Sequence, residues 1–304
     1  MAEILKGAPV AAAITVELTA RAERLKAAGV TPCLAILRVG ERPEDLTYER
    51  GTMKRCEKIG IRVVSVILPA DCSQEDLLAQ LRAINEDAAI HGCLMFRPLP
   101  GHLDEQAACE ALMPEKDVDS MTAASLNTVF TGRGKGYAPC TAQSCLEILD
   151  HYGFDPAGKH VAVIGRSLVI GKPVSMMLQS RNATVTMCHT KTVDMPAVCR
   201  SAEILVVAAG KAGVVDERFT HPEQVIIDVG INAAPGGGIC GDVQFDAVEP
   251  RARAISPVPG GVGAVTTAVL CKHVIEAAEK AAAEAAAAAN QAIIDSADEV
   301  TLLA

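Results

Sequence analysis

The sequence predicts an α/β protein of two domains, and three observations predict it. Short apolar runs alternate with helical patterns along most of the 304 residues, which is the order expected of parallel sheets. In the second half, runs rich in β-branched residues end in glycine, as in strands buried on both faces. The chain is 50% apolar, enough for two cores. We therefore expect an α/β N-terminal domain and a doubly wound parallel-sheet domain after it.

The first half alternates strands and helices. Residues 8–16 are apolar but continue at helical period, so they predict a helix rather than a signal peptide. The crossover helix over 73–87 opens with Ser73 as its N-cap, followed by acidic residues and apolar residues at helical spacing. The apolar runs that predict strands cover 33–40, 62–69 and 91–100.

The second half has a more regular pattern. Strands are predicted over 159–165, 183–189, 202–210 and 223–230, with helical stretches between the first three. Beyond 264 the chain becomes helical. Its Ala-rich stretch over 276–292 has high helix propensity and predicts an exposed or loosely packed terminal helix.

Charge and cysteine content exclude several classes of protein. A formal net charge of -9 argues against a nucleic-acid binder, which needs clustered Lys and Arg. The 11 cysteines include no CxxC pair, so we expect reduced thiols in the cytoplasm and no metal site. No stretch approaches the roughly 20 apolar residues of a membrane span. Small molecules are the expected partners.

A glycine turn marks the start of the doubly wound domain. Gly165 ends a predicted strand, and Gly171 begins a predicted helix. Backbone N–H groups at such a turn, aided by the helix dipole, bind a pyrophosphate. Ser167 replaces the second glycine of the usual dinucleotide pattern, so the turn could also be an ordinary tight one. Its position before a second strand favours a Rossmann-like nucleotide-binding domain.

The end of the second strand of this domain bears on the choice of cofactor. An acidic residue there would bind the ribose hydroxyls of NAD. The sequence has Thr190 and Lys191 instead, with Arg166 in the glycine turn. A hydroxyl and two cations suit a 2′-phosphate and favour NADP over NAD. The alternative is that Lys191 is a solvated loop lysine, which leaves NAD open.

Stiff loops precede helices in both halves. Residues 256–270 begin with two prolines and three glycines in eight residues, a composition that lets a backbone approach a flat ligand. The stretches 98–101 and 114–120 in the first half are also predicted to be stiff loops that contain proline. In the latter, alternate spacing places Asp117 and Asp119 on one side of the chain; the competing interpretation is that these acids are solvated at the surface.

Together these segments resemble the bifunctional methylenetetrahydrofolate dehydrogenase/cyclohydrolase family from about residue 5 to 275. The resemblance implies a folate-binding domain over 1–143 completed by a helix over 265–304, and an NAD(P)-binding Rossmann domain over 144–264. It implies tetrahydrofolate one-carbon derivatives as ligands, a cleft that holds both ligands, and a homodimer. The segments that resemble the family, in its order, are VGERPEDLTYERGTMKRCEKIGI, RPLP, PEKDVDS, PCTA, GRSLVIGKP, DVGIN and SPVPGGVGAVT.

The resemblance assigns roles position by position. It implies that Tyr48 stacks on the folate and that Asp119 hydrogen-bonds the pterin ring. The positions that match the loop closing over folate are Pro259, Gly260 and Gly261. The positions that match the cofactor-binding residues are Gly165, Arg166, Ser167, Thr190 and Ile231.

Four departures from the family pattern bear on the chemistry. Thr52 stands where the family has a lysine, and Phe96 where it has a glutamine. Asp45 replaces a serine, and Ala264 replaces a proline. Other departures from the usual residues are Ser120, Ala142 and Ser144.

The departures predict which activity survives. Hydride transfer to NAD(P) needs orientation of two rings rather than an acid or base. The cyclohydrolase step needs proton transfers that the family assigns to its lysine and glutamine, and Thr52 with Phe96 supplies neither. We therefore expect a methylenetetrahydrofolate dehydrogenase with weak or absent cyclohydrolase activity. A rival hypothesis is that Lys54 or another cation reaches the site and keeps the protein bifunctional.

Two other readings of the sequence stay open. The chain could be a non-catalytic folate- or nucleotide-binding paralogue, which would bind ligands without turnover. It could also be a nicotinamide dehydrogenase acting on another pterin or small substrate, because Asp45 and Phe96 lie where substrate would sit. Competition between candidate pterins in a turnover assay separates this second possibility from a methylenetetrahydrofolate dehydrogenase.

Overall fold

The computed structural model describes residues 1–234 and 236–302, with side chains described through Gln291. These residues form two compact units. The first unit comprises residues 1–16 and 117–270, and the second comprises residues 17–116 and 271–304. The functional boundaries predicted from the sequence, at 143–144 and 264–265, stay a prediction.

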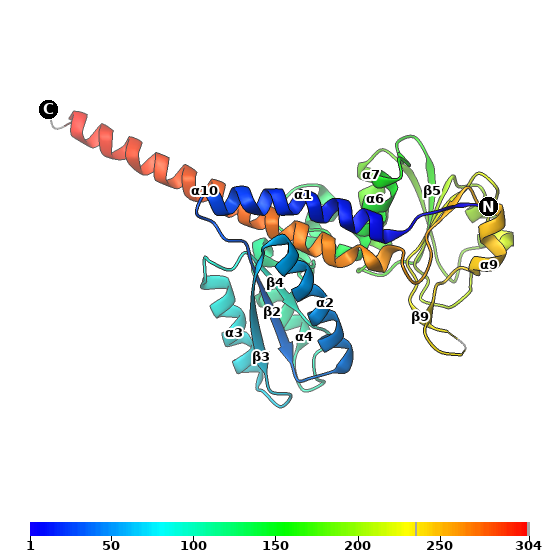
Figure 1. Ribbon diagram of the computed structural model, residues 1–304, viewed down its shortest axis with the longest axis horizontal. Coiled ribbons are helices and arrows are strands. Elements are labelled where there is room, and N and C mark those ends of the chain that lie inside the picture. The colour runs from blue at the N-terminus through cyan, green and yellow to red at the C-terminus, as the bar shows by residue number, and fades with distance from the viewer. Residues whose placement is uncertain (235, 303–304) are drawn as a thin grey trace. The chain divides into compact units, whose positions relative to one another are not determined.

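The second unit is built on a parallel sheet of three strands in the order β3-β2-β4 (Figure 1). Every residue of the central strand β2 (Cys33–Val39) is buried, because helices and loops cover both of its faces. The flanking strands are β3 (Arg62–Leu68) and β4 (Gly92–Met95). The parallel sheet confirms the sequence prediction, but the strand predicted over 91–100 ends at Met95 because the proline-rich loop follows it.

Local signals place the helices of this unit. Ser73 and Asp76 form a capping box at the start of α3 (Gln74–Glu86), which confirms the predicted crossover helix. Helix α2 (Pro43–Ile59) begins with proline and ends at Gly60, whose φ of 92° is the left-handed conformation that terminates helices. The remaining helical segments before residue 117 are α1 (Gly7–Ala27), α4 (Glu105–Ala111) and the 3-10 turn Pro114–Lys116.

The first unit contains a six-stranded parallel sheet in the order β1-β11-β8-β7-β5-β6. The four predicted strands are confirmed, whereas the pairing of the two-residue strand β1 with β11 has no sequence signal. A separate hairpin joins β9 to β10. The strands are β1 (Glu3–Ile4), β5 (His160–Ile164), β6 (Thr184–Cys188), β7 (Ile204–Val207), β8 (Val225–Asp228), β9 (Asn232–Ala233), β10 (Ile239–Cys240) and β11 (Ala254–Ile255).

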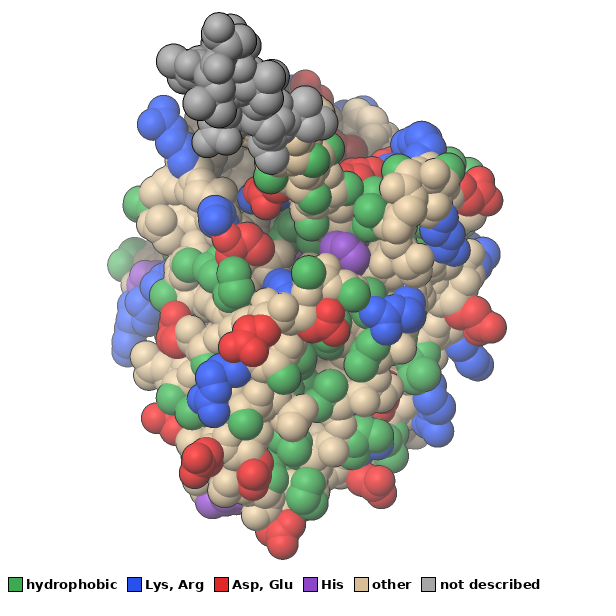
Figure 2. Space-filling model, turned by 90° about the vertical axis from the view of Figure 1, so that its left-hand side faces the viewer, with side chains coloured by type: hydrophobic (Ala, Val, Ile, Leu, Met, Phe, Trp, Pro, Cys, Tyr) green, Lys and Arg blue, Asp and Glu red, His purple; other side chains and the backbone are tan. Residues whose placement is uncertain are grey.

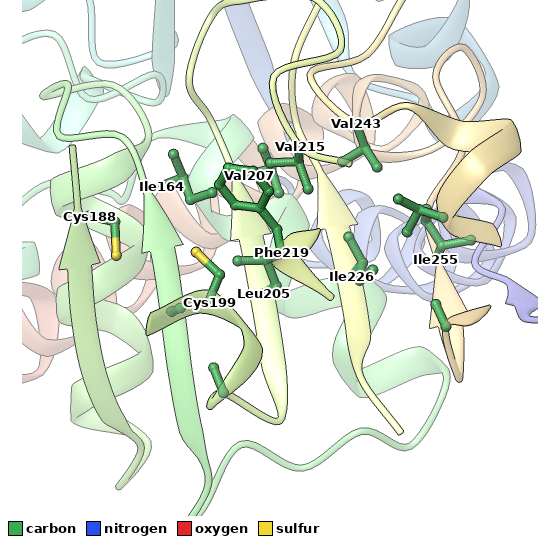
Figure 3. Packing of buried hydrophobic residues seen from close by; sticks show 14 of the residues in the cluster. Ile164, Cys188, Cys199, Leu205, Val207, Val215, Phe219, Ile226, Val243 and Ile255 are labelled. Atoms are coloured by element: carbon green, nitrogen blue, oxygen red, sulfur yellow. The ribbon is translucent and has the colours of Figure 1, made fainter. Parts of the chain in front are cut away.

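An apolar cluster covers one face of this sheet (Figure 3). Side chains of β5, β6, β7, β8 and β11 pack there against Phe219 and Cys199, which lie on segments in front of the sheet. The helical segments of the unit are α5 (Ala123–Thr131), α6 (Cys140–His151), α7 (Gly171–Ser180), α8 (Met195–Arg200), α9 (Phe245–Val248) and the 3-10 turns Glu217–Phe219, Glu249–Arg251 and Val262–Ala264.

The C-terminal helix α10 (Thr266–Leu302) confirms the predicted helical tail. It lies beside α1 in Figure 1, and Arg21 forms an ion pair with Glu279 at 2.6 Å. Of the Ala-rich stretch predicted over 276–292 to be exposed or loosely packed, nearly all side chains from 281 to 291 are exposed, but Ala277 and Ala278 are buried, and the side chain of residue 292 lies outside those described. No described helix is long and apolar enough to cross a membrane. Figure 2 shows acidic and basic side chains interspersed on one face.

Candidate functional site

A pocket lies at the carboxyl ends of β5, β6 and β7. Strand β6 lies next to β5 in one direction along the sheet, and the next strand of the chain, β7, lies next to β5 in the opposite direction. The strand order therefore reverses between β5 and β7, which is where ligands bind in open parallel sheets. The residues that line the pocket are Ile164, Gly165, Arg166, Ser167, His189, Thr190, Met195, Ala208, Ala209, Lys211 and Val214.

Two glycines make the turn between β5 and α7 possible. Gly165 has a φ of 122°, and a Cβ there would overlap the Ala208 carbonyl oxygen. A Cβ at Gly171 would overlap the Gly165 carbonyl oxygen, so the start of α7 lies directly on the turn. Ser167 accepts a hydrogen bond from the Ile170 N–H at 3.1 Å. The turn thus aims the N-terminus of a ten-residue helix at the pocket, an arrangement that fits a dinucleotide pyrophosphate.

The positive charge of the pocket differs in part from the sequence prediction. Arg166 and Thr190, two of the predicted cofactor residues, line it, whereas Lys191 and Ile231 are absent from its described lining. Lys211, which follows β7, provides the second cation. Lys211 could not be predicted from the dinucleotide pattern, because that pattern points only to the strand end about 20 residues past the glycine turn.

In the second unit, Thr52 and Phe96, two positions singled out in the sequence, lie beside Tyr48. The Tyr48 and Phe96 rings meet edge to face, with centroids 5.9 Å apart. Thr52 lies one helical turn after Tyr48 and is fully buried. Its hydroxyl has no hydrogen-bond partner among the described residues. Lys54 is exposed, on a different side of α2 from the buried Thr52.

Two ion pairs that have no local sequence signal lie on the buried face of α2. Arg38 on β2 donates to Glu49 at 3.0 Å, and both side chains are nearly buried. Arg42 holds the Asp45 carboxylate through two hydrogen bonds of 2.8 Å. Both carboxylates on the buried face of α2 are therefore neutralised by arginine.

Asp117 and Asp119, predicted to lie on one side of the chain, have different environments. Asp117 is fully buried and accepts hydrogen bonds from the Met121 and Thr122 N–H groups and the Ser125 hydroxyl. Asp117 therefore shapes the turn and is not a solvated surface acid. Asp119 is half-buried on the turn. Burial and the neighbouring Asp119 carboxylate raise the pKa of the Cys140 thiol well above its ordinary value.

The turn that carries Asp119 contains a residue with an unusual backbone conformation, Ser120. Ser120 has a φ of 59°, a left-handed conformation that costs a non-glycine residue free energy. Its side-chain oxygen is buried and has no hydrogen-bond partner among the described residues. Strained residues of this kind cluster at functional sites, so the conformation of Ser120 favours a functional role for the turn that carries Asp119.

The loop that contains Pro259, Gly260 and Gly261 is packed on the N-terminus of α1. The Gly260 carbonyl accepts a hydrogen bond from the Gly7 N–H at 2.8 Å. A Cβ at Gly7 would overlap the Gly261 carbonyl oxygen. The loop follows β11 and is held at Ser256, whose hydroxyl accepts from the Asp228 N–H. No group of three His, Cys, Asp or Glu side chains among the described residues could hold a metal ion.

Comparison with known families agrees with this geometry. The family profile described as tetrahydrofolate dehydrogenase/cyclohydrolase, catalytic domain, matches residues 5–119, and the NAD(P)-binding domain of the same family matches residues 139–282. The chain belongs to the tetrahydrofolate dehydrogenase/cyclohydrolase family. The dinucleotide pocket and the segment with Tyr48 and Thr52 thus fall in the domains to which the family assigns cofactor and catalysis.

Individual members of the family resemble the chain over nearly its whole length. Bifunctional protein FolD of Carboxydothermus hydrogenoformans is 50% identical over 281 residues, 92% of this chain and 98% of that protein. The crystal structure of FolD from Campylobacter jejuni has a TM-score of 0.88 at 34% identity and covers 92% of this chain and 99% of its own. FolD of Trypanosoma brucei, complexed with NADP and an inhibitor, has a TM-score of 0.84 at 36% identity, with coverages of 92% and 98%.

Below the cofactor pocket, Asp228 makes the stability of the protein depend on pH. Burial raises the pKa of its carboxyl to about 6, although three backbone N–H groups favour the charged form. The folded state then binds a proton more tightly than the unfolded state, so the stability contributed by Asp228 falls as pH rises from about 4 to about 6. We expect the free energy of unfolding of the wild type, relative to Asp228→Asn, to fall by about 3 kcal/mol across that window.

Denaturant titrations of both proteins at pH 4.5, 5.5 and 7 measure this difference. Subtracting the variant removes the opposite slope contributed by Glu203, Asp216 and Glu279, whose pKa values are lowered by their cationic partners. If the difference in unfolding free energy between the wild type and the variant stays constant, or grows with pH, the three N–H donors lower the pKa of Asp228 by at least as much as burial raises it.

Proposed function

We propose that the protein is a dehydrogenase that oxidises 5,10-methylenetetrahydrofolate to 5,10-methenyltetrahydrofolate with NAD(P), and that its cyclohydrolase activity is weak or absent. One observation supports the second part above all: the buried, unpaired Thr52 hydroxyl at the position of the family's lysine, one turn from Tyr48. The glycine turn and its pocket, which fit a dinucleotide, support the first part.

The oxidation removes a hydride from the one-carbon bridge of the folate and leaves a methenyl cation. The nicotinamide, when bound, accepts that hydride, so the protein needs to orient two rings rather than to transfer a proton. The edge contact from Phe96 fixes the plane of the Tyr48 ring, on which the folate would stack. Asp119 would orient the pterin by hydrogen bonding, from a turn held in shape by Asp117.

The cyclohydrolase reaction adds water to the methenyl cation and opens its ring, which requires proton transfer. A positioned acid or base contributes about 10²- to 10⁴-fold to such a step. Threonine does not titrate in the accessible range, and Phe96 presents only a ring. The exposed Lys54 lies away from the buried side of α2, and Glu49 and Asp45 are bound to arginines. Among the described residues of α2, the buried side of the helix thus carries no lysine, and both of its carboxylates are bound to arginine.

We infer that NADP is the preferred cofactor. Arg166 and Lys211 both line the pocket beside Thr190, and neither cation makes an ion pair with a described residue. Two unneutralised cations suit the extra 2′-phosphate of NADP better than the hydroxyl of NAD. FolD of Trypanosoma brucei, a member of the same family, binds NADP in its structure.

The decisive experiment mixes the purified protein with methylenetetrahydrofolate and either cofactor, and follows reduced nicotinamide and the methenyl chromophore together. We expect reduced NADP to appear with a methenyl signal that decays only at the spontaneous rate. Reduced cofactor without methenyl accumulation would show that cyclohydrolase activity survives. Ligand binding without turnover would favour a binding paralogue, and turnover only with another pterin would change the substrate.

We further infer a homodimer in the cytoplasm, with folate bound by residues 1–143 and 265–304 and NAD(P) by residues 144–264. The family resemblance supports the dimer and the division. Eleven free cysteines, nearly all buried, fit a reducing compartment. Sedimentation velocity tests the dimer, and a monomer at micromolar concentration would contradict it.

A further inference from the structure

Asp242 lies below the cofactor pocket and binds the loop that follows β7. Its carboxylate accepts hydrogen bonds from three consecutive backbone N–H groups, those of Ala209 at 2.6 Å, Gly210 at 2.9 Å and Lys211 at 2.9 Å. A fourth comes from the Asn232 side-chain amide at 2.9 Å. Asp242 is fully buried, so these four donors replace water around its charge.

The loop held by Asp242 forms one wall of the cofactor pocket. Ala208, Ala209 and Lys211 line the pocket, whereas Asp242 does not. Asn232, the fourth donor, follows Ile231 in the segment after β8. One carboxylate therefore ties together the ends of two neighbouring strands, β7 and β8, at the edge of the sheet where a dinucleotide would bind.

Asp242 is itself held in place by the second buried aspartate. Asp228 accepts hydrogen bonds from the backbone N–H groups of Asp242 at 3.1 Å and Val243 at 3.0 Å. Gly230 and Gly241 allow this close packing, because a Cβ at either would overlap an aspartate carboxylate. A series of hydrogen bonds thus leads from Asp228 at the end of β8 through Asp242 to the loop amides of the pocket wall.

We propose that Asp242 is a positioning residue for the nicotinamide cofactor: it fixes the wall at Ala209–Lys211 and, with it, the Lys211 cation. This inference rests on the proposed NAD(P) binding. Asparagine at 242 would keep the shape of the side chain but could accept through only one oxygen. Its NH₂ group would face backbone N–H donors, so the loop would move away from its present position.

The test compares Asp242→Asn with Asp246→Asn, an exposed aspartate on α9 that changes the same charge nearby. In Asp242→Asn we expect the KM for NADP to rise roughly 10- to 100-fold. A displacement of the pocket wall by about 1 Å is enough for an effect of that size. The KM for the folate, measured at saturating NADP, should change less than about two-fold. Asp246→Asn should match the wild type in both constants. An unchanged KM for NADP in Asp242→Asn would overturn the proposal.

A second measurement uses the wild type and does not depend on the variant folding. Hydrogen exchange without cofactor should show the amides of Ala209, Gly210 and Lys211 protected at least ten-fold over an open loop, because Asp242 binds all three. Exchange at open-loop rates would overturn the inference even if NADP binds. If the amides are protected but the wild type binds neither NAD nor NADP, the proposed function fails, and the role of Asp242 in cofactor positioning fails with it.

Discussion

A variant that combines Thr52→Lys with Phe96→Gln should acquire cyclohydrolase activity about 10²- to 10⁴-fold above the wild type, with a much smaller change in the dehydrogenase rate. The two substitutions would restore the residue types that the family resemblance assigns to proton transfer. The hydride step depends on ring orientation, to which these two positions contribute only through the edge contact from Phe96 to the Tyr48 ring. The expected result is therefore a change in the ratio of the two activities.

The surroundings of Thr52 support the function of a lysine placed there. Side chains on a helix point toward its N-terminus, so a lysine at 52 would extend over the turn that contains Tyr48 and Glu49. Glu49 is already bound to Arg38 at 3.0 Å. An added ammonium would share that carboxylate with a guanidinium, and repulsion between the two cations favours the neutral amine that accepts a proton.

Decay of the methenyl chromophore, measured with excess enzyme, gives the cyclohydrolase rate. The matched control is Thr52→Met with Phe96→Gln, which adds a chain of similar length without an amine. If the control gains as much activity as the lysine variant, the gain comes from packing rather than proton transfer. If the lysine variant gains nothing although it folds and keeps dehydrogenase activity, Thr52 and Phe96 are not the reason for a missing cyclohydrolase.

The fold could be predicted from the sequence wherever the signal is local. The capping residue Ser73, the β-branched runs of the doubly wound sheet and the glycine turn all act over a few residues, so their spacing is visible in one dimension. The strand predicted to reach residue 100 stops at Met95 because proline cannot donate to a ladder. Pairing of β1 with β11 joins residues some 250 positions apart, and no local pattern encodes it.

Among the candidate site residues, too, those with a local sequence signal could be predicted, and those that depend on contacts between distant segments could not. Gly165, Arg166, Ser167 and Thr190 were accessible to prediction because a known turn places them at strand ends. The roles proposed for Asp242 and Lys211 could not be predicted, because they depend on contacts between segments that follow different strands. The pair Arg38–Glu49 was missed for a related reason: a charged residue inside an apolar run looks like an error until its partner on the next helix is known.

Replacing Gly171 by alanine should disrupt the cofactor site, although helix propensity alone predicts the opposite. Alanine is favoured over glycine in helices by up to about 1 kcal/mol. At Gly171, however, the added Cβ would overlap the carbonyl group of Gly165 and the backbone nitrogen of Arg166. Backbone atoms cannot rotate away, so the turn must open. We expect a loss of about 1–3 kcal/mol in stability and roughly 100-fold in NADP affinity.

Gly51 provides the matched control, because it also lies in a helix and a Cβ there would meet nothing within 4 Å. Gly51→Ala should raise the free energy of unfolding by about 0.4–1 kcal/mol and leave NADP affinity unchanged. Denaturant titration and cofactor titration of both variants make the comparison. If Gly171→Ala stabilises the protein as Gly51→Ala does and still binds NADP, the start of α7 does not lie on the glycine turn. The two results together therefore separate helix propensity from the close backbone approach that a pyrophosphate site requires.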